Sequence, residues 1–416
     1  MTHPAIGIDF GTTNSVLALR GADGAVRTRT LPGGAVFRSV LCFWAGADGR
    51  PRDAAGPAAI EAYLESPLDS RLIMSMKSYL AQRSFTETRI LGRAFGLEAL
   101  VATFLRHWLG AALPDVAGAR IMIGRPVRFV GESADDAFGE QRLRAAFALA
   151  GLPDITLGLE PAAAGHRFAQ GLDRAATVLV ADFGGGTSDF SVLRFEPGPP
   201  RRVAALGHAG VGIAGDAFDF RIIDHVVSPR LGKGSTYRVM GGDPLPVPPA
   251  WYAGFARWHQ LSMMRAPRTL RDIAEVARTA EQPEALHDLI RLIEQDAGYG
   301  LYRAVSGVKA ALSVTDRAVL EFRHGGFALA APIARADFEA WIAPDLVRIA
   351  AAVDAALADA AIGPEAVDRV FLTGGTSLVP AVRRIFEARF GAARVVAGGE
   401  FVSVAEGLAL MAAEAA

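Results

Sequence analysis

Apolar runs with β-strand character flank a tight, glycine-containing turn at two places in this chain. The first lies at residues 5–20, and the second begins near residue 176. Between them the pattern predicts, in order, a loop-rich and then helical segment up to about residue 100, a helix at about 98–112, a strand at 119–124, an amphipathic helix at 135–150 and a helix opened by Glu160 and Pro161. Because strand, hairpin, strand and helix occur twice, we expect an α/β fold with two similar lobes.

The second half of the chain adds a different pattern. A stretch rich in proline and glycine, 229–249, predicts a long surface loop or the edge of a subdomain. The aromatic residues that follow, Trp251, Tyr252 and Trp258, are interpreted either as a small local core or as a partner surface. The remaining elements predicted are helices within 269–312, a short β region at 318–331, a long alanine-rich helix at 336–361, a strand from Val370, a helix after it and a final helix from about 402.

Length and composition narrow the class of protein. The 416 residues are 51% hydrophobic and 21% charged, which indicates a compact soluble protein with room for two lobes. A formal net charge of −1 gives no reason to expect a nucleic-acid partner, and we expect no membrane segment because charged residues break the longest apolar stretches. The single Cys42 excludes an internal disulfide, and the absence of a signal-peptide pattern makes the cytoplasm the expected compartment.

Lysine is rare in this sequence. Only three of the 43 Lys and Arg residues are lysines: Lys77, Lys233 and Lys309. A position that keeps lysine in an arginine-rich chain either needs a compact ammonium group or has kept it by chance.

The two hairpins have the chemistry of phosphate-binding turns. In each, an Asp ends the first strand, and glycines and threonines form the turn: DFGTTNS at 9–15 and DFGGGTSD at 182–189. Glycine lets backbone N–H groups converge on an anion, threonine hydroxyls add donors, and the Asp can hold a hydrated Mg²⁺ beside the phosphates. Two such hairpins predict a duplicated fold that closes on a nucleotide from both sides.

A third motif makes the resemblance specific. Together with GGTSLVP at 374–380, the two hairpins resemble the two phosphate motifs and the adenosine motif of the actin, hexokinase and heat-shock ATPase superfamily. The resemblance is closest to the heat-shock protein 70 (DnaK-type) chaperones. The segments MSMKSYL at 74–80, IGRPVRF at 123–129, Glu160-Pro161 and GGEF at 398–401 are similar to the short YegD-like branch of that family.

This resemblance implies a site for ATP or ADP with Mg²⁺. Asp9 and Asp182 take the positions of the metal-site residues, and Lys77, Glu160, Asp182 and Thr187 those of the catalytic residues. The implied nucleotide-binding residues are Gly11, Thr12, Thr13, Asn14, Gly184, Gly185, Gly186, Thr187, Gly215, Lys309, Ser313, Gly374, Gly375 and Thr376. ATP hydrolysis at such a site depends on positioning and electrostatics.

Five further positions are less clear. Asp189 fits either a turn-stabilising residue or a metal-shell ligand. Pro126 and Arg142 resemble residues that relay the nucleotide state in the chaperones, or are a strand-ending proline and a surface arginine. Ser306 and Leu378 depart from the family, which has an acidic residue and an arginine there. Without the acidic residue and the arginine, we expect weaker or less selective binding of the base.

The resemblance also implies a domain layout. We expect lobe I at 1–172, with an insertion at about 37–100, and lobe II at 173–416, with an insertion at about 220–337. The fold class expected is the two-lobed actin-like ATPase fold with duplicated ribonuclease-H-like lobes. Within these 416 residues we expect no peptide-binding domain, so lobe motion would act on a protein partner of unknown identity.

Three functions are consistent with the sequence. The first is a slow Mg²⁺-dependent ATPase that resembles a chaperone nucleotide-binding domain. The second is a nucleotide-dependent binding or regulatory module that hardly hydrolyses ATP, as Ser306 and Leu378 could imply. The third is an actin-like filament former or a small-molecule kinase.

Overall fold

The computed structural model describes residues 4–30, 34–66, 69–112, 119–130, 134–196, 202–240, 242–257, 264–398 and 402–415. The chain divides into two compact units. We call Met1–Gly215 with Leu346–Ala416 the two-sheet unit, and Asp216–Asp345 the helical unit. The chain passes between them within two helices, α5 (Gly215–Ile222) and α11 (Arg335–Asp359).

The first sheet of the two-sheet unit is built around the N-terminal hairpin. Its path runs β11-β10-β1-β2-β3, and β4 also pairs with β2. The pairs β1–β2 and β2–β3 are antiparallel, whereas β1–β10 and β10–β11 are parallel. The strands are β1 (Ala5–Phe10), β2 (Asn14–Arg20), β3 (Val26–Thr28), β4 (Phe37–Arg38), β10 (Arg120–Arg125) and β11 (Ile155–Leu159).

The second sheet repeats this topology. Its order is β14-β13-β12-β19-β20, with β12–β13 and β13–β14 antiparallel and β12–β19 and β19–β20 parallel. The strands are β12 (Ala176–Phe183), β13 (Ser188–Glu196), β14 (Arg202–Val211), β19 (Arg369–Thr373) and β20 (Val395–Ala397). All eight residues of β12 are buried. Each sheet therefore contains a hairpin, a third antiparallel strand and two parallel strands, and the first sheet adds β4. This repeat agrees with the two similar lobes that the sequence pattern predicted.

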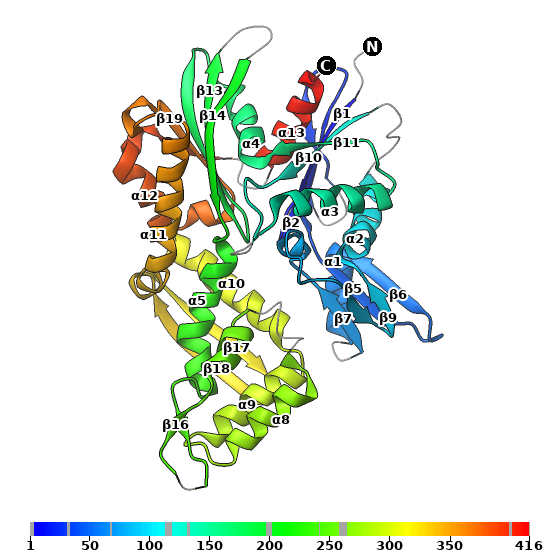
Figure 1. Cartoon of the computed structure of the whole chain (residues 1–416), viewed down its shortest axis with the longest axis vertical. Coiled ribbons are helices and arrows are strands. Elements are labelled where there is room, and N and C mark those ends of the chain that lie inside the picture. Colours follow the sequence, from blue (N-terminus) through cyan, green and yellow to red (C-terminus); the bar gives the residue numbers. More distant parts are fainter. Residues whose placement is uncertain are drawn as a thin grey trace. The chain divides into compact units, whose positions relative to one another are not determined.

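Two helices join the sheets. Figure 1 shows α4 (Glu160–Ala169) and α13 (Ser403–Glu414) between the strands of the second sheet and those of the first. Their small residues share one apolar cluster with Met122 of the first sheet and with Val178 and Val180 of the second. The helices come so close that a methyl group on Gly407 would lie 1.7 Å from the carbonyl oxygen of Ala163. This layer fixes the two hairpins relative to each other.

The other helices of the two-sheet unit agree with the sequence pattern. Helices α2 (Leu97–Ala112), α3 (Asp136–Leu149) and α12 (Pro380–Phe390) form where helices were predicted. Asp135 caps α3, because its carboxylate accepts a hydrogen bond of 3.0 Å from the backbone N–H of Phe138.

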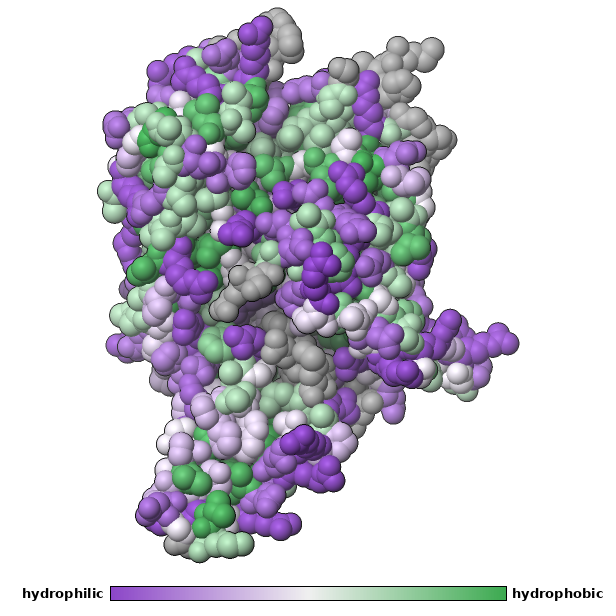
Figure 2. All heavy atoms as spheres, in the orientation of Figure 1, coloured by the Kyte–Doolittle hydropathy of each residue, from purple (hydrophilic) through white to green (hydrophobic). Residues whose placement is uncertain are grey.

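The segment before α2 differs from the prediction. It was expected to be loop-rich and then helical, but much of it is β structure. Its elements are β5 (Leu41–Ala45), β6 (Pro51–Ala55), α1 (Gly56–Glu65), β7 (Ser70–Ile73), the 3₁₀-helix η1 (Met76–Tyr79), β8 (Thr88–Ile90) and β9 (Arg93–Phe95). The strands are only three to five residues long, and most of β6 is exposed, so apolar alternation is weak. Figure 2 shows that the projecting turn between β5 and β6 is hydrophilic.

The helical unit contains the predicted helices and a hairpin. Its elements besides α5 and the first part of α11 are the π-helix η2 (Ile223–Val227), the 3₁₀-helix η3 (Ser228–Leu231), β15 (Thr236–Tyr237), β16 (Leu245–Pro246), α6 (Pro249–Phe255), α8 (Pro267–Ala277), α9 (Pro283–Glu294), α10 (Gly298–Val314), β17 (Arg317–His324) and β18 (Phe327–Ala334). Tyr252 is fully buried and donates a hydrogen bond to the carbonyl of Leu231, which supports the local-core interpretation of the aromatic residues. Trp258 lies outside the described residues.

The contact between α4 and α13 gives a direct test of this layer. Gly407→Ala should lower the free energy of unfolding by about 2 kcal/mol, because the new methyl group has no space. Gly110→Ala in α2 is the matched control: nothing lies within 4 Å of its added methyl group, and stability should stay constant or rise by up to about 1 kcal/mol. Urea denaturation measures both. Equal stability of the two variants would contradict this packing.

Candidate functional site

Two aspartates occupy equivalent positions in the two sheets. Asp9 is the second-last residue of β1, and Asp182 is the second-last residue of β12. Each is followed by the tight turn of its hairpin; in the second hairpin the N–H of Gly184 donates to the carbonyl of Thr187 at 2.9 Å. The duplicated topology therefore places the two carboxylates, and the two turns, at matching ends of their sheets.

The two turns approach each other within the two-sheet unit. A methyl group on Gly186 of the second turn would lie 3.6 Å from Oγ1 of Thr12 in the first turn. The same point is 3.4 Å from Oγ of Ser78 and 2.9 Å from a methyl carbon of Val130. The structure thus brings the first turn, the second turn and η1 to one place.

A buried ion pair lies beside these turns. Lys77 in η1 and Glu160, the first residue of α4, are joined by a contact of 2.5 Å between Nζ and Oε1. Both side chains are only 7% exposed. The structure therefore brings together the lysine and the glutamate that the resemblance selected, which are 83 positions apart in the sequence.

Burial and like charge shape the electrostatics of this cluster. Burial, followed by the negative charge of Glu160, raises the pKa of Asp9 to about 7 and raises that of Asp182 well above its ordinary value. Burial alone would lower the pKa of Lys77, but the charges of Glu160 and Asp9 outweigh it and raise that pKa. One ammonium group thus leaves the surrounding carboxylates incompletely neutralised.

This cluster suits a hydrated divalent cation. Among the described residues, no three His, Cys, Asp or Glu side chains are arranged to hold a metal ion by themselves. Magnesium is commonly bound by one or two carboxylates and completes its octahedral shell with waters and phosphate oxygens. Asp9 and Asp182 are two hard oxygen donors in a site where one ammonium group faces several carboxylates, and they fit that mode of binding.

The third motif packs directly onto the second hairpin. Gly374 has a φ of 84°, and a methyl group there would lie 2.0 Å from the carbonyl oxygen of Phe183, so only glycine fits. Oγ1 of Thr376 reaches the carbonyl of Gly184 at 3.4 Å. Gly375 and Thr376 begin the 3₁₀-helix η6 (Gly375–Leu378), so all three motifs meet in the two-sheet unit.

The remaining nucleotide-site candidates begin or lie in other helices. Gly215 is the first residue of α5. Lys309 and Ser313 lie on α10 of the helical unit, where Nζ of Lys309 pairs with the buried Asp219 at 2.9 Å. The hydroxyl of Ser313 donates to the carbonyl of Lys309 at 3.2 Å in the same helix.

Asp189 links the second hairpin to the first sheet. Its Oδ1 accepts hydrogen bonds from the backbone N–H groups of Val127, at 2.8 Å, and Arg128, at 3.3 Å, directly after β10 and Pro126. Asp189 also has a side-chain hydrogen bond with Thr187 of its own turn, and together these bonds support the interpretation of Asp189 as a turn-stabilising residue. Burial and the charge of Glu160 raise its pKa to about 7, although these hydrogen bonds oppose the shift.

Arg142 is not a surface arginine. It is 4% exposed, and its guanidinium binds the segment that follows Lys77. Nε donates to the carboxylate of Glu98 at 2.6 Å. The other donors bind the backbone carbonyls of Tyr79, Gln82 and Phe85 at 3.4, 3.3 and 3.0 Å. Arg142 therefore anchors η1 and the loop behind it.

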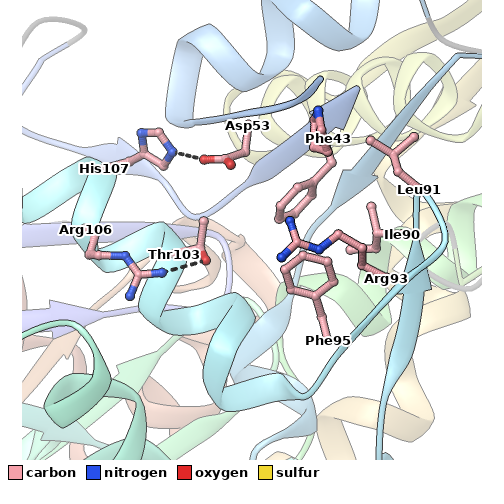
Figure 3. Close-up of a pocket in the computed structure, with 10 residues that line it drawn as sticks. Phe43, Asp53, Ile90, Leu91, Arg93, Phe95, Thr103, Arg106 and His107 are labelled. Carbon is pink, nitrogen blue, oxygen red and sulfur yellow. Dashed lines mark hydrogen bonds and ion pairs between the residues drawn. The ribbon is translucent and has the colours of Figure 1, made fainter. Parts of the chain in front are cut away.

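A separate pocket of about 550 Å³ is lined by residues of the inserted segment and of α2. Figure 3 shows Phe43, Phe95 and Arg93 on one side and the pairing of His107 with Asp53 on the other. None of its lining residues belongs to the three motifs or to the ion pair described above.

Comparison with known proteins agrees with this architecture. The family model described as "Hsp70 protein" matches residues 138–233 and 292–413, which is more than half of the chain. The chain is 29% identical over 397 residues to the chaperone protein DnaK of Thermotoga petrophila, covering 93% of this chain and 55% of that protein. It is 28% identical over 424 residues to the chaperone protein HscA homolog of Bordetella petrii, covering 98% of this chain and 57% of that protein.

The fold is therefore the actin-like ATPase fold, as predicted. The chain belongs to the Hsp70 family. It spans only 55–57% of the length of these curated relatives. Its assignment to the YegD-like branch stays a prediction. None of the helices in the described residues is long and apolar enough to cross a membrane.

The anchoring by Arg142 predicts a selective change at Lys77. Arg142→Gln should increase the reactivity of Lys77 toward acetic anhydride by about tenfold, because the segment behind η1 opens locally. The other lysines serve as internal references, and Lys309 should stay protected by Asp219. Arg144→Gln, on the same helix, is the matched control. Unchanged reactivity of Lys77, or an equal rise at Lys309, would contradict the anchoring role.

The charge imbalance predicts that one substitution stabilises the protein. Asp182→Asn should raise the free energy of unfolding of the nucleotide-free protein by about 1 kcal/mol, because it removes a buried charge that carboxylates surround. Asp345→Asn is the control: that buried carboxylate is paired with Arg221 at 2.8 and 3.0 Å, and its neutralisation should destabilise by about 2 kcal/mol. Destabilisation by Asp182→Asn would show that its charge is already compensated.

Proposed function

We propose that this chain binds Mg²⁺ and ATP at the two facing hairpins and hydrolyses ATP slowly, as a chaperone-like nucleotide-binding module. The observation that carries this proposal is the meeting of two equivalent aspartates, two glycine- and threonine-containing turns and a buried Lys–Glu pair at one place. These are the parts that phosphoryl transfer requires: charge neutralisation, a held cation and an oriented water.

Each part has a chemical role in this proposal. Asp9 and Asp182 would hold the cation, which supplies positive charge to the phosphate oxygens when it is bound. Thr12, Thr13 and the backbone N–H groups of the second turn donate hydrogen bonds to the phosphates. These donors are fixed by the strands before and after them, so little reorganisation is needed during the reaction.

Lys77 and Glu160, the two residues of the ion pair, would act directly in phosphoryl transfer. The ammonium of Lys77 faces the site beside the carboxylates and would neutralise charge that develops on the transferred phosphoryl group. The carboxylate of Glu160 would orient the attacking water and accept its proton. Thr187, at the end of the second turn, would contact the terminal phosphate.

The base site is less well defined by the residues present. Leu378, where the family resemblance implies an arginine, is 50% exposed in η6. A leucine side chain has no charged group to stack on a base and no hydrogen-bond donor for the ribose. This favours modest affinity for the nucleoside and supports the second candidate function, a nucleotide-dependent binding module with little turnover.

The partner is inferred from the family. Relatives named as chaperones are longer than this chain, which covers 55% of the DnaK protein of Thermotoga petrophila. We infer that the nucleotide state of this module controls its interaction with a protein partner or client. The two-sheet unit would respond through the two turns that contact the nucleotide from opposite sheets.

The Lys77 assignment separates catalysis from binding. Lys77→Ala should lower phosphate release at least about 100-fold and change the Kd for Mg·ATP less than about threefold, because electrostatic stabilisation of the transition state is lost. Lys233→Ala, which removes an ion pair with Asp224 in the helical unit, is the control and should keep full turnover.

Two outcomes would change this conclusion. Full turnover in Lys77→Ala would remove the catalytic role of Lys77. Tight binding of Mg·ATP by the wild-type protein with no phosphate release would favour the binding module. Because Lys77→Ala leaves Glu160 unpaired, the circular dichroism spectrum and the Tm of Lys77→Ala, compared with those of the wild-type protein, check that lost turnover does not reflect misfolding.

A further inference from the structure

We propose that the hydroxyl of Ser78 is an additional phosphate-binding donor of this site, beside the turn threonines. The proposal rests on the proposed function, because it assigns Ser78 to the same nucleotide. The sequence patterns did not select Ser78, although it directly follows Lys77.

The position of the hydroxyl carries the inference. Oγ of Ser78 lies 3.4 Å from the point where a methyl group on Gly186 would stand, and Oγ1 of Thr12 lies 3.6 Å from the same point. A methyl carbon of Val130 lies nearer to this point, at 2.9 Å, and the two hydroxyls, one from the first hairpin and one from η1, lie beside it. Since residue 186 is glycine, its backbone also stays accessible there.

The hydroxyl has no hydrogen-bond partner among the described residues. Ser78 is 8% exposed, and its Oγ makes no hydrogen bond with any residue that the structure describes. Ser78 Oγ is not one of the fully buried side-chain atoms that lack a partner, so it keeps a small accessible surface and can donate to a group that enters the site. The neighbouring turns are suited to bind a phosphate, and one of its oxygens would accept a hydrogen bond from Ser78.

The backbone of Ser78 is fixed on both sides. Its N–H donates to the carbonyl of Ser75 at 3.0 Å, and its carbonyl accepts from Nε2 of Gln82 at 2.9 Å. The carbonyl of Gln82 in turn accepts from Arg142. The hydroxyl is therefore presented by a segment that is held before any ligand binds, which lowers the cost of ordering it on binding.

The chemistry of the site also favours a neutral donor. Glu160, Asp9 and Asp182 already surround Lys77, and a polyphosphate adds further negative charge. A serine hydroxyl contributes a hydrogen bond to a phosphate oxygen without changing this charge balance. Ser78 would thus donate a hydrogen bond to the phosphates, as Thr12 would, while the cation and Lys77 neutralise the negative charge.

Calorimetry and thermal unfolding test this assignment together. Ser78→Ala should weaken binding of Mg·ATP about tenfold, because one hydrogen bond to a charged oxygen is lost. The Tm of the nucleotide-free variant should stay at the wild-type value, since the hydroxyl has no partner in the protein, and the rise in Tm with Mg·ATP should shrink. Ser70→Ala is the control: Ser70 is equally buried, but its hydroxyl donates to the carbonyl of Ser66, so only stability should fall.

The outcomes separate this inference from the proposed function. If the wild-type protein binds Mg·ATP and Ser78→Ala binds it equally well, the role of Ser78 is wrong and the proposed function stands. A drop in the nucleotide-free Tm of Ser78→Ala without loss of affinity would mean that the hydroxyl is structural. If the wild-type protein does not bind Mg·ATP, the proposed function itself fails.

Discussion

The buried ion pair between Lys77 and Glu160 is the interaction on which the site depends. It joins η1 of the inserted segment to the first turn of α4, and it places one ammonium group among several carboxylates. In a site shielded from water, unneutralised charge is costly, which explains why the pKa values of Asp9 and Asp182 rise. The nucleotide-free protein therefore holds an acidic cluster. A bound cation would stabilise this cluster because it would reduce the repulsion between the carboxylates.

The duplicated fold explains how this cluster arises. Two sheets of the same topology present Asp9 and Asp182 at equivalent strand ends, and the layer of α4 and α13 holds the sheets together. Glu160 is the first residue of α4, so the helix that packs between the sheets also carries a proposed catalytic residue. A displacement of α4 would change both the contact at Gly407 and the position of the carboxylate partner of Lys77. We propose that this shared helix would couple nucleotide binding to the arrangement of the two sheets.

Sequence patterns identified features that depend on local chemistry. The turns after Asp9 and Asp182 were recognisable because glycine and threonine at fixed offsets are typical of phosphate-binding turns. The long helices were recognisable from their clear apolar periodicity. The strands β5 to β9 were missed because each is only three to five residues long, and β6 and β9 are also largely exposed, so they give little alternation. Contacts between distant segments are a second reason. The resemblance selected Arg142 but did not show that it binds the loop behind η1, and a single serine at position 78 gives no sign that its hydroxyl lies near Gly186.

The central claim is that Asp9 and Asp182 bind ATP through a shared magnesium ion. Isothermal titration of ATP into the wild-type protein, once with Mg²⁺ and once with EDTA, tests it most directly. The account predicts that Mg²⁺ tightens ATP binding by at least about tenfold, because the cation neutralises the buried carboxylates and the phosphates together. Equal affinity with and without Mg²⁺, or no binding under either condition, would contradict the account.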